Sequence, residues 1–234
     1  DLEQEDFEHL FKRAIQLKAR YARGIFDSLL TGKTLGLIFD KKSTRTRISF
    51  ETAMIQLGGH PIYMSTQDTQ ISRNEPAKDT ARVLSRYIDC LAMRTFDHEL
   101  VEEFAKSSSI PVINALTDSF HPCQILSDLM TIIEHKGGYE KVKIAWVGDG
   151  NNVANSWVNA ASVLGFDLRL ACPDGYSIRQ DIIANAGANT MANIEFTNDP
   201  KEAVKNADVV YTDVWASMGE EAELAGRLAA FESF

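Results

Sequence analysis

Short apolar runs alternate with amphipathic stretches along most of the chain, a pattern typical of parallel strands joined by helices. The chain opens on a predicted helix whose apolar side chains recur at helical spacing from Phe7 to Ile15. Candidate strands follow at 34–39, 61–64, 90–93 and 110–116, with candidate helices at 50–57, 80–87 and 99–106 between them. Because runs this apolar are buried on both faces, we expect a parallel sheet covered by helices.

The second half of the chain repeats this alternation without visible sequence repetition. A helix over 124–135 ends at Gly137-Gly138, and strands at 142–147, 168–171, 194–196 and 208–212 alternate with helices at 153–164, 179–186 and 201–206. We therefore predict an α/β protein of two domains, 1–136 and 137–234. Each is expected to be a mostly parallel sheet flanked by helices, with the active site in the cleft between them. Open α/β sheets bind ligands at the carboxyl ends of their strands, so the loops after strands are the places to look for chemistry.

Composition restricts the class of partner. The 234 residues are 44% hydrophobic and 24% charged, which suits a globular protein with a sizeable core. The net charge of −9 argues against nucleic acid and anionic lipid as main partners, so any anion site must be local. No apolar run approaches the length of about 20 residues that spans a bilayer, and the acidic start is unlike a signal peptide. The three cysteines fit neither a disulfide framework nor zinc spacing, and we expect a cytoplasmic protein.

The run from Ser43 to Arg47 reads Ser-Thr-Arg-Thr-Arg and lies between a predicted strand and a predicted helix. Its hydroxyls and the first amides of the helix would point at one spot, where the helix dipole also favours an anion. Arg45 and Arg47 add fork-shaped donors suited to phosphate or carboxylate. In the plainer alternative, Ser43 or Thr44 caps the helix and the arginines pair with surface carboxylates. The run is not a Walker A loop, because the glycines and the Gly-Lys-Ser/Thr ending are absent.

Two further strand ends in the first half carry polar side chains. Arg94 follows the strand at 90–93, and His121-Pro122-Cys123-Gln124 opens the next helix. Proline is favourable in a first turn, and His121 and Gln124 are three residues apart, so both could face one cleft. Taken singly, His121 could be a cap or a buried hydrogen-bonding group, and Arg94 a solvated side chain. We expect Cys123 to be packed rather than reactive, because nothing near it clearly supplies a base.

In the second half, the first strand-to-helix turn reads Gly-Asp-Gly-Asn-Asn from Gly148 to Asn152. Val153 occupies the place of the third glycine in G-x-G-x-x-G, so the signal for a dinucleotide site is weak. Asn152 offers a donor and an acceptor, which suits the amino-acid end of a zwitterionic substrate.

The run Asp213 to Gly219, Asp-Val-Trp-Ala-Ser-Met-Gly, follows the last strand. Asp213 could hold an ammonium group, while Ser217 and the nearby backbone could bind other polar groups of the same ligand. The alternative is an ordinary turn with Trp215 packed beneath it.

Taken in order, these segments resemble the aspartate/ornithine carbamoyltransferase family, and specifically its ornithine branch. Ser-Thr-Arg-Thr-Arg and His-Pro-x-Gln match the family's carbamoyl phosphate signatures, and Asp-x-Trp-x-Ser-Met-Gly matches the substrate loop of the ornithine branch. The resemblance covers nearly the whole chain. It implies transfer of the carbamoyl group from carbamoyl phosphate to the δ-amine of ornithine, within arginine metabolism and without a metal or organic cofactor. It also implies carbamoyl phosphate binding by 1–136, ornithine binding by 137–234, and a homotrimer, or a multiple of it, with sites between subunits.

The resemblance also assigns residues. Those matched to carbamoyl phosphate are Ser43, Thr44, Arg45, Thr46, Gln70, Arg94, His121 and Gln124. Gln70 would reach the carbamoyl phosphate of a neighbouring subunit. Those matched to ornithine are Asn152, Asp213, Ser217 and Met218. Catalysis would rest on Thr46, Arg94 and His121 around the carbonyl oxygen, and on Asp213, which would orient the attacking amine.

The sequence departs from the family pattern at one point. The family continues with a His-Cys-Leu-Pro loop and a final helix bearing an arginine, both part of its site, and this sequence contains neither. Cys90, Cys123 and Cys172 do not lie in the matching context. We therefore expect the ornithine domain to be shortened at its C-terminal end. For a protein that stops at Phe234, carbamoyl phosphate binding should be weakened and turnover severely reduced.

Other functions remain as alternatives. An aspartate carbamoyltransferase shares the first half, but its substrate has an extra carboxylate and needs more cations than the loop at Asp213 offers. Putrescine and acylated ornithine are alternative acceptors. A non-catalytic anion-binding module is the alternative from a different class. A nicotinamide-dependent dehydrogenase would rest only on Gly148 and Gly150.

Overall fold

The computed structural model describes residues 2–65, 75–187, 192–215, 224–232 and 234. Its described strands form two sheets, each of four parallel strands. Contacts group the chain into two units, Leu10–Cys123, here the first unit, and Asp1–His9 with Gln124–Phe234, here the second unit. No helix in the described ranges is long and apolar enough to cross a membrane.

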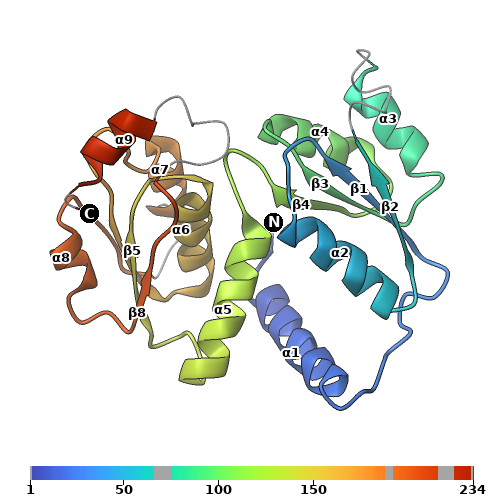
Figure 1. Cartoon of the computed structure of the whole chain (residues 1–234), viewed down its shortest axis with the longest axis horizontal. Coiled ribbons are helices and arrows are strands. Elements are labelled where there is room, and N and C mark those ends of the chain that lie inside the picture. Colours follow the sequence, from blue (N-terminus) through green and yellow to red (C-terminus); the bar gives the residue numbers. More distant parts are fainter. Residues whose placement is uncertain (1, 66–74, 188–191, 216–223, 233) are drawn as a thin grey trace. The chain divides into compact units, whose positions relative to one another are not determined.

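The sheet of the first unit has the strand order β2-β1-β3-β4 (Figure 1). Its strands are β1 (Thr34–Phe39), β2 (His60–Met64), β3 (Cys90–Arg94) and β4 (Val112–Leu116). The chain leaves β1 toward β2 on one side and then returns to β3 on the other. The strand order therefore reverses beside β1, and such a reversal is where open α/β sheets bind ligands.

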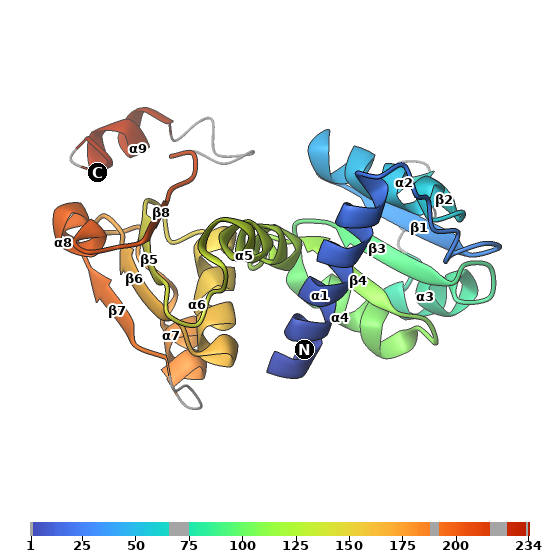
Figure 2. The same cartoon turned by 90° about the horizontal axis from the view of Figure 1, so that it is seen from below.

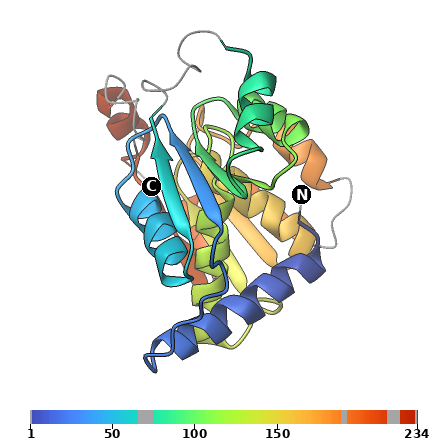
Figure 3. The same ribbon diagram turned by 90° about the vertical axis from the view of Figure 1, so that its right-hand side faces the viewer.

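Helices cover both faces of this sheet (Figures 2 and 3). Helices α3 (Ala77–Leu84) and α4 (His98–Ser107) pack on one face, where Phe104 meets Ile38 in a buried cluster. Helix α2 (Arg45–Gln56) packs on the other face, where Met54 meets Leu37. Successive strand residues point to opposite faces, which is why Leu37 and Ile38 belong to different clusters.

The sheet of the second unit has the strand order β7-β6-β5-β8. Its strands are β5 (Lys143–Val147), β6 (Asp167–Ala171), β7 (Ile194–Thr197) and β8 (Val209–Tyr211). Helices α6 (Asn152–Leu164) and α7 (Gln180–Gly187) lie on one face, and α8 (Pro200–Val204) on the other (Figure 2). Helix α5 (Pro122–Lys136) precedes β5, and α9 (Leu224–Ala230) follows β8 along the chain.

Helix α6 shows how its sequence specifies a buried element. Asn151 caps its start by accepting hydrogen bonds from the amides of Val153 and Ala154, and Gly165 ends it in the left-handed conformation. The apolar side predicted from the helical spacing is buried at every position: Val153, Trp157, Ala160, Ala161 and Leu164.

The predicted alternation of strands and helices is confirmed, with a few local differences. Strand β4 begins at Val112 rather than residue 110, directly after Pro111, which has no amide hydrogen to donate to a ladder. Helix α8 ends at Val204, and Asn206 then adopts a positive φ of 61°. Helix α1 (Gln4–Tyr21) is present, yet Leu10 on its predicted apolar side is 41% exposed.

Helix α9 was not predicted from the sequence. Contacts place α5 from Gln124 onward in the second unit, and the functional domain boundary after residue 136 stays a prediction.

Candidate active site

The predicted site segments of the first unit follow strands that are neighbours in the sheet. Strand β1 leads to Ser43–Arg47, β3 ends on Arg94, and β4 leads to His121. Parallel strands carry their carboxyl ends to the same edge, so these three segments meet at one edge of the first unit. The sheet topology therefore unites residues that lie far apart in the sequence.

The start of helix α2 is not capped by its own side chain. Thr44 holds the N-cap position but makes no side-chain capping hydrogen bond, and the first turn contains no acidic residue. The first amides of an α-helix have no acceptor within the helix, so those of Arg45 and Thr46 can bind an anion there. The capping alternative therefore does not account for Thr44. Ser43 and Thr46 are half-buried on either side of it.

The two arginines of this turn have different surroundings. Arg47 Nε donates to Glu51 Oε1 at 2.9 Å, and its guanidinium lies 3.5 Å from the centre of the Tyr63 ring. This matches the alternative in which an arginine pairs with a surface carboxylate. Arg45 forms no ion pair with any carboxylate in the described part of the chain. Arg45 is thus the arginine of this turn whose charge remains for a ligand.

Arg94 is a buried cation, only 6% exposed. Burial lowers the pKa of its guanidinium, and the neighbouring charge of Arg45 lowers it further. Its Nε atom is buried with no hydrogen-bond acceptor among the described residues, and Arg94 forms no ion pair with any described carboxylate. Burying a charge is costly unless the charge is paired, so a bound anion would supply what the described residues do not.

His121 lies next to this cationic pair. Burial, and then the charge of Arg94, lower the pKa of its imidazole to about 4. The ring is therefore neutral near pH 7, with one N–H donor and one acceptor nitrogen. It can donate a hydrogen bond to an oxygen without adding a further positive charge beside Arg94.

Gln124 belongs to a polar cluster of the second unit that the sequence did not indicate. Its Nε2 donates to Asp128 Oδ1 at 3.0 Å. Burial raises the pKa of Asp128, while hydrogen bonding from Tyr211 and Gln124 opposes that rise. The Tyr211 ring is stacked on Trp146 at 5.3 Å and meets Trp157 edge-on at 5.7 Å. Both tryptophans are fully buried, so the phenol is held firmly in place.

Asp213 meets the turn after β5 because β8 and β5 are neighbours. Asn151 Nδ2 donates to Asp213 Oδ2 at 3.3 Å, and the amide of Val214 donates to Oδ1 at 2.7 Å. The carboxylate is thus oriented before any ligand arrives. Asn152, the predicted ligand-binding residue, lies one position further on in the first turn of α6, where its carbonyl accepts from Ser156 Oγ. Sequence reasoning missed Asn151, although asparagine before a helix is a recognisable cap.

Gly150 of this turn is required for packing. A Cβ on Gly150 would lie 2.5 Å from the carbonyl carbon of Ser177 and 2.6 Å from the nitrogen of Ile178. The Gly150 amide donates to the Tyr176 carbonyl at 2.8 Å. The turn therefore requires a glycine for a close backbone approach within the protein, and this accounts for Gly150 without a dinucleotide.

A buried ion pair ties helix α9 to the same turn. Arg227 Nη1 donates to Asp149 Oδ2 at 2.6 Å and to the carbonyl of Trp215 at 3.2 Å. The side chains are 8% and 11% exposed. Arg227 therefore connects the turn after β5 with the segment that follows Asp213. This pair could not be predicted from the sequence, because its members are 78 residues apart.

Some predicted site residues lie outside the described residues, namely Gln70, Ser217 and Met218. The three cysteines are all described, and none of them forms a disulfide. Burial raises the pKa of Cys123 to about 11, and its thiol donates to the Asn114 carbonyl at 3.4 Å. A thiol held in its neutral form is a poor nucleophile, in agreement with the prediction that Cys123 is packed. The described residues contain no group of histidines, cysteines and carboxylates able to hold a metal ion.

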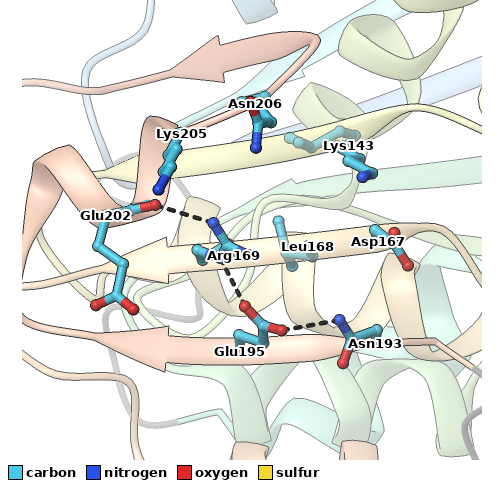
Figure 4. Close-up of a pocket in the computed structure, with 12 residues that line it drawn as sticks. Lys143, Asp167, Leu168, Arg169, Asn193, Glu195, Glu202, Lys205 and Asn206 are labelled. Atoms are coloured by element: carbon cyan, nitrogen blue, oxygen red, sulfur yellow. Dashed lines mark hydrogen bonds and ion pairs between the residues drawn. The ribbon is translucent and has the colours of Figure 1, made fainter.

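A hollow of about 370 Å³ opens at the other end of the second sheet, near the amino ends of β5, β6 and β7 (Figure 4). Its central arginine is already bound within the protein: Arg169 donates to Glu195 at 2.6 Å and to the Glu202 carbonyl at 2.9 Å. Asn193 completes this network by donating to Glu195. The hollow lies at the end of the sheet opposite the carboxyl strand ends, and Arg169 and Glu195 already bind partners within the protein, so it does not match the place expected for the active site.

Comparison with known protein families matches both halves of the chain. A model described as the aspartate/ornithine carbamoyltransferase carbamoyl-P binding domain matches residues 1–134. A model of the Asp/Orn binding domain of the same enzymes matches residues 140–234.

Individual relatives agree with these family matches. Ornithine carbamoyltransferase of Geobacter sulfurreducens is 54% identical over 98% of this chain and 76% of its own length. The enzyme of Syntrophus aciditrophicus is 54% identical over 100% of this chain and 78% of its own. Among solved structures, ornithine carbamoyltransferase of Pyrococcus furiosus matches with a TM-score of 0.92 at 48% identity, over 98% of this chain and 74% of that one. The anabolic ornithine carbamoyltransferase of Campylobacter jejuni has a TM-score of 0.92 at 43% identity, over 100% and 77% of the two chains.

Proposed function

Because the chain belongs to the aspartate/ornithine carbamoyltransferase family, we propose that it transfers the carbamoyl group of carbamoyl phosphate to the δ-amine of ornithine, giving citrulline and phosphate. The observation that carries this proposal is Arg94, a buried cation beside Arg45 that has no carboxylate partner among the described residues. Ornithine as the acceptor is supported by the relatives, which are ornithine carbamoyltransferases at 47–55% identity, and by the Asp-x-Trp-x-Ser-Met-Gly run from Asp213.

The phosphate of carbamoyl phosphate is assigned to the turn before α2. Ser43, Thr44 and Thr46 supply hydroxyl donors, and Arg45 supplies a charged fork whose geometry matches two phosphate oxygens. Support comes from the uncapped helix start and from the absence of acidic residues in the first turn. Gln70 is assigned to the carbamoyl phosphate of a neighbouring subunit by the family resemblance alone.

The carbamoyl carbonyl oxygen is assigned to Thr46, Arg94 and His121. As the amine attacks, this oxygen becomes negative, and donors already aimed at it stabilise the transition state by about 3 kcal/mol each. The neutral His121 donates without the repulsion that an imidazolium would suffer beside Arg94. Gln124 is assigned to the carbamoyl amide.

Ornithine is assigned to Asn152, Asp213, Ser217 and Met218. Asp213 is held by Asn151 and by the Val214 amide, so it can orient an amino group of the substrate without first reorganising. An alkylamine with a pKa near about 10.4 must lose a proton before it can attack. The new bond joins its nitrogen to the carbamoyl carbon, the bond from that carbon to the phosphate oxygen breaks, and the leaving phosphate accepts the amine proton. Alignment of the two substrates contributes about 7–11 kcal/mol.

Three broader features belong to the same proposal. The carbamoyl phosphate domain is assigned to 1–136 and the ornithine domain to 137–234. The enzyme is proposed to act in the cytoplasm, in agreement with three cysteines that form no disulfide, and the family resemblance assigns it to arginine metabolism. It is proposed to form a homotrimer or a multiple of it, on the family resemblance, and light scattering tests this directly because a monomeric mass in solution would contradict it.

The acceptor is tested by supplying carbamoyl phosphate together with ornithine, aspartate, putrescine or N-acetylornithine. We expect citrulline as the dominant product. Dominant carbamoyl-aspartate or carbamoyl-putrescine would assign the enzyme to another member of its family, and the absence of every product would contradict the transferase.

Carbamoyl phosphate binding is tested by thermal unfolding. At about 100 times its Kd, the ligand should stabilise the protein by about 2.7 kcal/mol. Arg94→Met should lose this stabilisation, yet without ligand it should melt no earlier, because it removes a buried charge that the protein does not pair. The control is Arg82→Met, since Arg82 is exposed on α3 and pairs with Asp79. Equal ligand stabilisation of wild type and Arg94→Met would contradict the site.

A further inference from the structure

The orientation of the Gln124 side chain matters for the carbamoyl group. A glutamine amide has a donor end, the NH₂ group, and an acceptor end, the carbonyl oxygen. The carbamoyl group presents an NH₂ of its own, which is a donor. Gln124 can hold that NH₂ only if its own carbonyl oxygen, Oε1, faces it. The opposite orientation would set two donors against each other.

Asp128 decides between these orientations. It lies one helical turn after Gln124 on α5 and accepts from Gln124 Nε2 at 3.0 Å. An ionised carboxylate can only accept hydrogen bonds, so the amide nitrogen must face it. The Tyr211 hydroxyl also accepts from the Gln124 amide. Both polar neighbours therefore engage the nitrogen and leave Oε1 as the end available to a ligand.

Tyr211 in turn steadies Asp128. The second carboxylate oxygen, Oδ2, is buried and has no hydrogen bond of ordinary geometry among the described residues, and the Tyr211 hydroxyl is the donor beside this carboxylate. The phenol cannot easily move, because its ring lies between the buried Trp146 and Trp157. Asp213 is a further carboxylate close enough to act electrostatically on both Asp128 and Tyr211. The two tryptophans fix the Tyr211 ring, the Tyr211 hydroxyl binds the Asp128 carboxylate, and that carboxylate accepts from Gln124.

We propose that Asp128 and Tyr211 are positioning residues that fix the Gln124 amide with its carbonyl oxygen toward the carbamoyl NH₂, so that the enzyme distinguishes a carbamoyl group from an acyl group of the same shape. This inference rests on the proposed function, which assigns Gln124 to carbamoyl phosphate. It goes further by naming the residues that determine which end of the Gln124 amide faces the carbamoyl NH₂.

The test compares two ligands, carbamoyl phosphate and acetyl phosphate, which carries a methyl group where the carbamoyl group has NH₂. Dissociation constants are measured for wild type, Asp128→Asn and Tyr211→Phe. Asparagine keeps the shape of Asp128 but can donate as well as accept, so it no longer selects one amide orientation. Phenylalanine keeps the ring between the tryptophans and removes only the hydroxyl.

We expect both variants to bind carbamoyl phosphate about threefold to tenfold more weakly, the loss of roughly one hydrogen bond, and to bind acetyl phosphate as wild type does. In a protein that already carries Gln124→Ala, adding Asp128→Asn should not change the dissociation constant for carbamoyl phosphate any further. Matched controls are Asp181→Asn, an exposed carboxylate on α7, and Tyr139→Phe, a buried tyrosine packed on Phe166. Both controls should keep the wild-type ratio of the two affinities.

A purely structural role would weaken both ligands together, and that result would overturn the inference, as would unchanged affinities in the variants. If Asp128→Asn does not fold, Tyr211→Phe decides by the same ratio. The proposed function fails in a different way: wild type would then make no citrulline and bind the two ligands equally.

Discussion

Replacing Arg227 by methionine should destabilise the second unit by about 3–5 kcal/mol, because it leaves Asp149 buried without this cation. The pair is short, with 2.6 Å between Nη1 and Oδ2, and the side chains are only 8% and 11% exposed. Arg227 also binds the Trp215 carbonyl, and its guanidinium lies over the Tyr176 ring at 4.9 Å. Since whole domains are stable by about 5–15 kcal/mol, this loss would be a large share of the total.

Tryptophan fluorescence during urea unfolding reports the unfolding of the second unit alone. The chain has three tryptophans, Trp146, Trp157 and Trp215, and all lie in the second unit. Two of them are fully buried, so their emission should change strongly on unfolding. The free energy extrapolated to water, compared between wild type and Arg227→Met, gives the cost directly.

Arg179→Met is the matched control. Arg179 and Asp181 also lie 2.6 Å apart, but their side chains are 52% and 58% exposed, and exposed pairs of this kind contribute little. Arg179→Met should therefore scarcely change the unfolding curve, and the double variant Asp149→Asn with Arg227→Met should recover most of the lost stability. Equal losses in the two single variants would refute the reasoning, because the pairs have the same length and differ in burial and in the further contacts of Arg227 with Trp215 and Tyr176.

Two other predictions concern single residues. Burial and Arg94 lower the pKa of His121 to about 4, so between pH 6.5 and 4 the unfolded chain binds a proton that the folded chain does not. Stability from this source is complete above pH 6.5 and falls toward pH 4 by on the order of 3 kcal/mol. His121→Gln should flatten that part of the pH profile, measured by circular dichroism in urea, and an identical profile would contradict the lowered pKa. Gly150→Ala should destabilise the second unit by about 3 kcal/mol because its Cβ meets the Ser177 backbone. A Cβ on Gly187 meets no atom of the described residues, so Gly187→Ala should be close to neutral, and tryptophan fluorescence distinguishes the two.

The sheets could be predicted from the sequence because the apolar runs that form them are local. The run at 34–39 matches β1 at both ends, and every position of the predicted apolar side of α6 is buried. A predicted strand start differed from the observed one where a proline interrupted the apolar run. Strand β4 begins at Val112 because Pro111 has no amide hydrogen to donate. The exposed Leu10 of α1 shows a limit of periodicity, since spacing predicts which side of a helix is apolar and not what covers it.

The candidate site was predictable only in part. The segments that follow β1, β3 and β4 were predicted as site segments because parallel strands carry their carboxyl ends to the same edge of the sheet, whatever the conformation of the connecting loops. Asp149 and Arg227 were missed, since nothing near either residue in the sequence indicates a partner 78 residues away. Asp128 was missed for another reason: a carboxylate in a helix is usually solvated, and only the packing of Tyr211 between two tryptophans gives it a buried role.

Arg94 and Arg227 are the buried arginines of the described chain, and the contrast between them separates structure from function. Both guanidiniums lose solvation on burial, which costs several kcal/mol unless an anion compensates. The fold provides Arg227 with Asp149, so that charge contributes to the native structure. For Arg94 the described residues provide a second cation, Arg45, and a histidine that stays neutral. Without a ligand, two neighbouring guanidiniums with no carboxylate lower the stability of the fold. A bound anion would compensate for this cost by pairing with both charges. A protein of net charge −9 that leaves two guanidiniums together and unpaired in this way has concentrated its positive potential where carbamoyl phosphate is proposed to bind.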